Sequence, residues 1–175
     1  MSHLTVMGAL AAAGVLGIAS SAHAVFMQRT VDFSTDDNGN PIANGQLIAN
    51  DNAEFFTDFQ LSSTSADGLF SAAFDSTPGG PNDPRQDTDL LVGLGNVLIF
   101  QNDDAPAISG DVYNSPNDST DNGTWTFDFS AGLRASPVVE LLDITLVDID
   151  GSASMSIVLT DLANNTRTYT VPTNW

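Results

Sequence analysis

The chain has 175 residues and a formal net charge of −18, with 22 acidic residues against four basic residues, all of them arginines. Nucleic acids and anionic membrane surfaces attract clusters of lysine and arginine, so this composition excludes binding to either. Hydrophobic residues make up 42% of the chain, which excludes an acidic disordered tail and predicts a folded domain with a buried core.

The first segment has the features of a signal peptide. Residues 4–18 form an uncharged run rich in alanine, leucine and glycine, and Ala22-His23-Ala24 follows with the small residues of a signal-peptidase site. The usual lysine or arginine before the run is missing, and the run is short for a membrane span. We predict a signal peptide over residues 1–24 and no membrane span in the mature chain; an uncleaved N-terminal helix is the alternative.

Cleavage after Ala24 would change the chemistry that the chain can perform. Both histidines, His3 and His23, leave with the signal peptide, and the rest of the chain has neither cysteine nor lysine. This excludes Ser-His-Asp and Cys-His nucleophiles, a lysine Schiff base, and zinc or copper sites built on imidazole or thiolate. Ca²⁺ is the metal ion that best fits an exported chain of this composition, because it prefers carboxylate and carbonyl oxygens as ligands.

Residues 25–175 read as one domain made of short strands and many loops. Trp125, Phe127 and Phe129 alternate with polar residues, and this period of two is typical of a half-buried strand. About eight such runs predict an all-β fold, an antiparallel jelly-roll-like β-sandwich. The expected strands are residues 30–34, 54–61, 69–74, 96–101, 124–129, 138–147, 154–159 and 166–171.

Two connections are long and polar. Residues 77–89 and 102–123 are rich in Asp, Asn, Gly and Pro, and loops of this length without secondary structure are uncommon in a compact domain. Either a bound ion or ligand orders them, or, for the second connection, the chain forms a disordered bulge. A third polar stretch, Asp36-Asp37-Asn38-Gly39-Asn40, begins like a calcium loop, but Pro41 and Leu47 occupy positions that need Gly and an acid. It is therefore a turn or a partial ligand cluster.

The acidic pairs beside the expected strand ends are candidate metal ligands. Side chains at positions i and i+2 of an extended chain share one face and can converge on one cation, which would also relieve the repulsion between the two carboxylates. The alternative is solvated turn residues in an acidic protein. The candidate Ca²⁺ ligands are Asp87, Asp89, Asp104, Asp148 and Asp150.

Paired carboxylates could also hydrolyse glycosidic bonds, since that chemistry needs no histidine. Glu54 and Glu140 are the only glutamates, and both are more simply explained as solvent-facing residues of strands, as is Asp143. No catalytic residue and no organic cofactor is predicted.

Short motifs follow one another in order along the chain. They are Thr30-Val31-Asp32-Phe33, Gly39-Asn40-Pro41-Ile42-Ala43-Asn44-Gly45, Ala73-Phe74-Asp75-Ser76, Asp87-Thr88-Asp89-Leu90, Gly95-Asn96-Val97-Leu98-Ile99, Gly123-Thr124-Trp125-Thr126-Phe127, Leu141-Leu142-Asp143-Ile144 and Val147-Asp148-Ile149-Asp150. In this order they resemble a domain of exported bacterial surface proteins, many of which carry a PEP-CTERM sorting tail. The resemblance implies a calcium-stabilised β-sandwich of the cell surface or extracellular matrix, with no established catalysis. No sorting tail follows residue 171, so we expect either a freely secreted protein or a fragment cut before further strands.

These observations favour a non-enzymatic, secreted or cell-surface β-sandwich with a structural, adhesive or matrix role. Its expected partners are extracellular polysaccharide or other surface proteins. A carbohydrate-binding module is the first alternative, because it shares the fold and often the calcium. A carboxylate-dependent glycoside hydrolase is the second.

Overall fold

The described part of the chain is built from short antiparallel strands. This computed structural model describes residues 28–48, 55–66, 68, 70–83, 88–102, 108–119, 122–130, 139–147 and 155–172. Within them lie β1 (Gln60–Ser65), β2 (Ser71–Asp75), the 3-10 turn η1 (Thr88–Leu90), β3 (Asn96–Phe100), β4 (Ile108–Ser109), β5 (Val112–Tyr113), β6 (Gly123–Asp128), β7 (Met155–Thr160) and β8 (Thr166–Val171). The predicted all-β class is confirmed, with every ladder antiparallel. The described residues contain no helix long and apolar enough to cross a bilayer.

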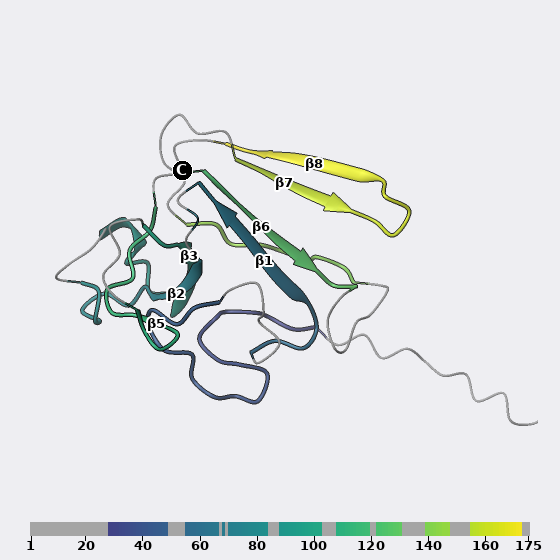
Figure 1. Cartoon of the computed structure of the whole chain (residues 1–175). Helices are drawn as coiled ribbons and strands as arrows, with labels where there is room; N and C mark the ends of the chain where they lie inside the picture. Colours follow the sequence, from purple (N-terminus) through teal and green to yellow (C-terminus); the bar gives the residue numbers. More distant parts are fainter. Residues whose placement is uncertain are drawn as a thin grey trace, which may run out of the picture. The chain divides into compact units, whose positions relative to one another are not determined.

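The strands form four ladders of two strands each: β1 with β6, β2 with β3, β4 with β5 and β7 with β8. Of these paired strands, β1 and β6 are the farthest apart in the sequence. They run side by side in Figure 1, with Leu61 opposite Phe127 and Ser63 opposite Trp125. All of these elements belong to one compact unit, Val31–Trp175.

The β2–β3 ladder is covered on both of its faces. Ala73 of β2 belongs to a first apolar cluster, whereas Ala72 and Phe74 belong to a second, because successive side chains of a strand point to opposite faces. All three side chains are fully buried. The second cluster also contains Leu90, Ile99 and Tyr113.

Backbone hydrogen bonds connect the β2–β3 ladder to the β4–β5 ladder through residues 45–48. On one side, Gly45 N donates to Ala73 O (2.7 Å) and Ile48 N donates to Ser71 O (2.9 Å). On the other side, Tyr113 N donates to Gly45 O at 2.8 Å. Residues 45–48 therefore lie between β2 and β5 as a short antiparallel connection, which the bridges Leu47 to Ala72 and Gln46 to Val112 also define.

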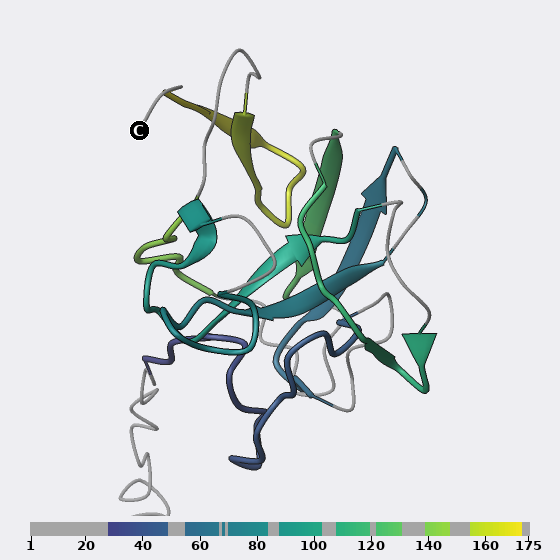
Figure 2. The ribbon, with the colours of Figure 1, turned by 90° about the vertical axis from the view of Figure 1, so that its left-hand side faces the viewer.

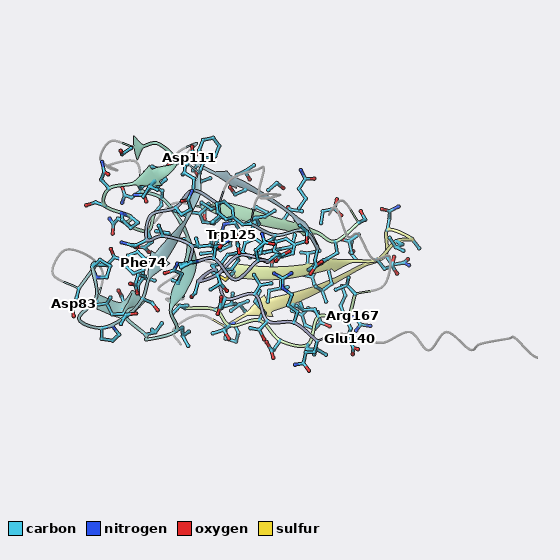
Figure 3. All side chains as sticks on the ribbon, turned by 90° about the horizontal axis from the view of Figure 1, so that it is seen from below. Phe74, Asp83, Asp111, Trp125, Glu140 and Arg167 are labelled. Atoms are coloured by element: carbon cyan, nitrogen blue, oxygen red, sulfur yellow. The ribbon has the colours of Figure 1, made fainter. Side chains whose placement is uncertain are left out.

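The first apolar cluster lies between the β1–β6 and β2–β3 ladders. It combines Leu61 of β1 with Ala73 of β2 and is lined by partly buried Trp125 and Phe127 of β6. The Trp125 ring stacks on Phe100 of β3, with centroids 3.9 Å apart. Its indole N–H donates to Ser71 Oγ at 2.7 Å, so the two ladders are joined by packing and by a hydrogen bond. Figure 3 labels Trp125 and Phe74 in this packed part of the molecule.

A chain of phenylalanine rings fills the same cluster. Phe56 packs edge-on against Phe33 (5.6 Å between centroids) and parallel to Phe59 (5.3 Å). Phe59 in turn contacts Phe127 and Phe129 of the β6 region, at 5.5 and 5.7 Å. Aromatic burial of this kind supplies large apolar area with directional ring contacts.

Within the described residues, some of the strands expected from the sequence are absent, and two strands that were not expected are present. Residues 30–34, 55–59 and 139–147 are not strands, although the last range is rich in apolar residues. Residues 102–123, expected to be a loop, contain β4 and β5. The strands predicted at residues 154–159 and 166–171 are confirmed as β7 and β8, which form a hairpin shown in yellow in Figure 2, although most of their side chains are exposed.

Candidate functional site

Of the five candidate calcium ligands, the structure describes one. Asp89 lies in the turn η1 with its side chain exposed. Asp87, Asp104, Asp148 and Asp150 lie outside the described residues. Among the residues that are described, no three acidic side chains come together in a group that could hold a metal ion.

The loop that leads from β2 toward Asp89 is organised by a pair of asparagines. Asn82 is buried, with 3% of its surface exposed, and it exchanges two side-chain hydrogen bonds with Asn44 (2.9 and 3.0 Å). Asn82 Nδ2 also donates to the Asp75 carbonyl (3.0 Å), and Asn44 Oδ1 accepts from Asp75 N (2.9 Å). The described half of the loop predicted at residues 77–89 is thus ordered by hydrogen bonds within the protein.

Two carboxylates of this loop accept backbone hydrogen bonds. Asp75 Oδ1 accepts from Thr77 N at 2.9 Å, and Asp83 Oδ2 accepts from Gly79 N. Asp83 is exposed and lies on an outer loop in Figure 3, close in sequence to Asp87 and Asp89. Each of these hydrogen bonds uses one carboxylate oxygen. We name residues 75–89 the β2–η1 loop; its described residues carry Asp75, Asp83 and Asp89, which are near the predicted ligand Asp87 in the sequence.

The Asp36–Asn40 stretch is a closed turn. Asp36 Oδ1 accepts from the backbone N–H groups of Asn38 (2.8 Å) and Asn40 (2.7 Å), and Oδ2 accepts from Asn40 Nδ2 (2.8 Å). These bonds, led by the Asn40 side chain, lower the pKa of Asp36. The neighbouring Asp37 carboxylate accepts from the backbone N–H and hydroxyl of Thr57, at 2.7 and 2.6 Å. Of the two interpretations of this stretch, the geometry favours the turn.

The same turn closes the β7–β8 hairpin. Asp161 accepts from the backbone N–H groups of Ala163 (2.9 Å) and Asn165 (2.8 Å) and from Asn165 Nδ2 (2.8 Å). The pKa of Asp161 is lowered by the same type of bonds, that from the Asn165 side chain first. Asn164 has a φ of 63°, as Gly39 has 82° at the equivalent position. The signal for both turns is an Asp followed four residues later by Asn, with Gly or Asn in between. A turn was one of the two predicted interpretations of the stretch at Asp36, whereas the turn at Asp161 was not predicted.

The carboxylates considered for hydrolysis do not form a described pair. Glu140 and Asp143 are exposed, as expected for solvent-facing residues, and Glu54 lies outside the described residues. The aromatic side chains Trp125, Phe127 and Phe129 pack against the first cluster, which confirms their interpretation as core.

Buried polar groups near β3 and β5 are the remaining unusual feature. Gln101 is fully buried, and its Oε1 accepts from Asn117 N at 3.3 Å, while its Nε2 has no hydrogen-bond partner. Burial raises the pKa of the Tyr113 hydroxyl, an effect that the backbone N–H of Phe70 partly offsets. Tyr113 belongs to the second cluster, and Gln101, just after β3, is buried as well.

Comparisons with protein-family models, with curated proteins and with solved structures each find no match.

Proposed function

We propose that the chain is an exported, non-enzymatic β-sandwich module of the cell surface or extracellular matrix, whose acidic loops bind Ca²⁺. Export rests on the signal-peptide features of residues 1–24, and it predicts a secreted protein that begins at Val25. The non-enzymatic role rests on the residue types left after cleavage, which include no histidine, cysteine or lysine.

The finer architecture that we propose is a jelly-roll-like sandwich. Residues 45–48 bond to both β2 and β5, so the β2–β3 and β4–β5 ladders can act as parts of one sheet. The β1–β6 ladder packs across the first cluster from β2, as the second sheet of a sandwich does. Cross-strand contacts between backbone protons, measured by NMR, test the strand order beyond these contacts.

The observation that carries the calcium proposal is the β2–η1 loop. Asn82 and Asn44 hold its described half in one conformation, and it bears Asp75, Asp83 and Asp89 as well as the predicted ligand Asp87. A fixed backbone lowers the entropy cost of gathering ligands around an ion, and extracellular calcium modules typically bind with Kd of about 10⁻⁴–10⁻³ M.

A thermal melt in EGTA and in a Ca²⁺ titration tests this proposal. Ligand that binds the native state adds RT ln(1 + [L]/Kd), or about 1.4 kcal/mol at tenfold Kd, so Tm should rise with Ca²⁺. NaCl at matched ionic strength is the salt control. The double variant D87N/D89N should lose most of the rise, whereas D143N, an exposed Asp outside the proposed sites, should keep it. Equal melts in EGTA and Ca²⁺ would refute the calcium site.

A carbohydrate-binding module is the second candidate, favoured by two exposed rings. Phe70 is 43% exposed and Tyr169 is 46% exposed, so both present area on which a sugar could stack. Retention on a glycan array that is lost in Y169A or F70A would support this function. A chain that binds no glycan but responds to Ca²⁺ would support the structural role instead.

A further inference from the structure

The described C-terminal residues, 139–147 and 155–172, contribute no buried side chain to either apolar cluster. They nevertheless carry most of the exposed large apolar side chains of the described chain. These are Val139, Leu141, Leu142, Ile144, Met155, Val158, Leu159, Leu162 and Tyr169. Contiguous exposed apolar area is typical of an interaction site, and the β7–β8 register shows where such side chains are neighbours.

The β7–β8 hairpin has one apolar face. The register places Met155 opposite Val171 and Ile157 opposite Tyr169, so these four side chains share a face. Leu159 and Arg167 complete it, and the Arg167 guanidinium donates to the Tyr169 hydroxyl at 3.4 Å. A two-stranded hairpin alone is marginally stable in water, and a third strand is what gives such a face independent stability.

The outer edge of β7 can accept that strand. Asp161 N donates to Asn165 O at 3.0 Å, which makes this the bonded pair next to the hairpin loop. Bonded and unbonded pairs alternate along an antiparallel ladder, so Ser156, Val158 and Thr160 direct their backbone N–H and C=O groups away from β8. Within the described residues, β8 is the only strand that pairs with β7.

The charge pattern indicates what the added strand is. β7 has no charged residue and no proline, so it lacks the features that usually protect an exposed edge from pairing. Residues 155–172 contain one acidic residue, Asp161, and one basic residue, Arg167. The net charge of this segment is therefore zero, in a chain with a net charge of −18. A second copy can approach this hairpin without bringing carboxylates of both copies into contact.

We infer that β7 pairs with β7 of a second copy of this chain, antiparallel and around a twofold axis. Such a contact is isologous, because the same edge serves both copies. It joins the two hairpins into a four-stranded sheet and brings their apolar faces onto one side. The inference goes beyond the proposed function and does not depend on calcium.

Sedimentation of the 175-residue chain over a range of concentrations tests the pairing. The mass should double as concentration rises, and added NaCl should strengthen the dimer, because salt screens the repulsion between two acidic copies. V158K places a lysine in the edge strand β7 and should raise the Kd of the dimer at least about tenfold. V92K is the matched control, since Val92 is 42% exposed, Val158 is 54% exposed, and both variants add one positive charge.

Amide hydrogen exchange locates the contact. Exchange at Ser156, Val158 and Thr160 should slow as the dimer forms, and both variants should keep the wild-type circular dichroism. A chain that stays monomeric at every concentration and salt would overturn the inference. So would a dimer that V158K and V92K weaken equally, or one in which these three amides gain no protection, because its contact would then lie elsewhere.

Discussion

At the residue scale, buried amides hold the β2–η1 loop against the sheet. Asn82 is nearly inaccessible to solvent, and all its described bonds go to Asn44 and to the end of β2. Removing one partner of a buried hydrogen bond leaves the other unsatisfied, which is more costly than the net value of the bond.

Replacing Asn82 with alanine should therefore lower the free energy of unfolding by about 1–3 kcal/mol. N44A should cost a similar amount, and the double variant should cost less than the sum, because both changes remove the same bonds. Urea unfolding measures all three. N122A, at an exposed asparagine whose described bond uses the backbone carbonyl, is the control and should change little. Additive costs would show that the two amides act independently.

Also at the residue scale, Asp36 and Asp161 make the stability of the folded state depend on pH. Their pKa values lie below the ordinary carboxyl value in the folded chain, chiefly because of Asn40 and Asn165. The stability they contribute is therefore fully present above the ordinary carboxyl pKa and is lost as pH falls through the lowered values.

The variant N165A should raise the pKa of Asp161 toward its ordinary value and leave that of Asp36 unchanged. The reason is that the largest cause of the shift at Asp161 is the Asn165 side chain, while Asp36 has its own partner. Carboxyl ¹³C chemical shifts followed through an acid titration report both groups in one sample. An unaltered Asp161 titration in N165A would mean that the backbone N–H groups alone set the shift.

At the scale of elements, Gly45 allows residues 45–48 to lie beside β5. Its φ is 81°, and a Cβ atom there would collide with the Tyr113 carbonyl oxygen. Gly39 has nearly the same φ, 82°, but nothing lies within 4 Å of its Cβ position. A comparison of the two glycines therefore separates the cost of a left-handed backbone from the cost of the collision.

G45A should destabilise the fold by clearly more than G39A, which should cost about 1–2 kcal/mol for the left-handed backbone alone. Thermal unfolding of the two variants gives the difference. In G45A we also expect faster amide exchange at Tyr113, whose N–H donates to Gly45 O. Equal losses in the two variants would show that the β5 backbone moves away at little cost.

The elements that the sequence predicted best are those with a complete alternation. Residues 124–129 and 166–171 repeat apolar and polar side chains and nearly match β6 and β8. Residues 45–48 and β4 and β5 were missed because they are too short to show a period, and their positions depend on hydrogen bonds to strands distant in sequence. Residues 139–147, the described part of the strand predicted at 138–147, are not a strand, because an apolar run indicates that a strand can form but not that a partner strand is present.

At the scale of the whole molecule, the β2–β3 ladder is the centre of the fold, since both of its faces are covered. Phe74 is fully buried in the second cluster, whereas Phe70, just before β2, is 43% exposed. The two positions offer the same side chain in opposite environments.

F74A should cost about 3–5 kcal/mol, which would unfold a marginally stable domain at moderate temperature. F70A, the matched control, should cost much less. Denaturant unfolding followed by tryptophan fluorescence measures both, since Trp125 reports on the contact between the ladders. Similar losses at the two positions would contradict the assignment of β2 as the central strand.

The candidate site was predictable only in part at this scale. The abundance of Asp beside strand ends is visible in the sequence, and Asp83 extends the predicted set within the β2–η1 loop. The Asp-to-Asn spacing of the turns at Asp36 and Asp161 is visible in the sequence, but spacing alone does not distinguish an ion from an N–H group as the partner of a carboxylate.

The pairing of β1 with β6 also sets the order in which the fold can form. The ladder ends with Ser65 opposite Gly123, so its formation closes a long loop between these two residues, at a cost in chain entropy. The β2–β3, β4–β5 and β7–β8 ladders each join strands that are neighbours in the sequence. Distant pairings of this kind form late and slow folding. A chain that emerges from its N-terminus therefore lacks the β6 partners of Phe59 and Leu61 until Phe127 and Phe129 are present. The first apolar cluster is therefore complete only after β6 has been added to the chain.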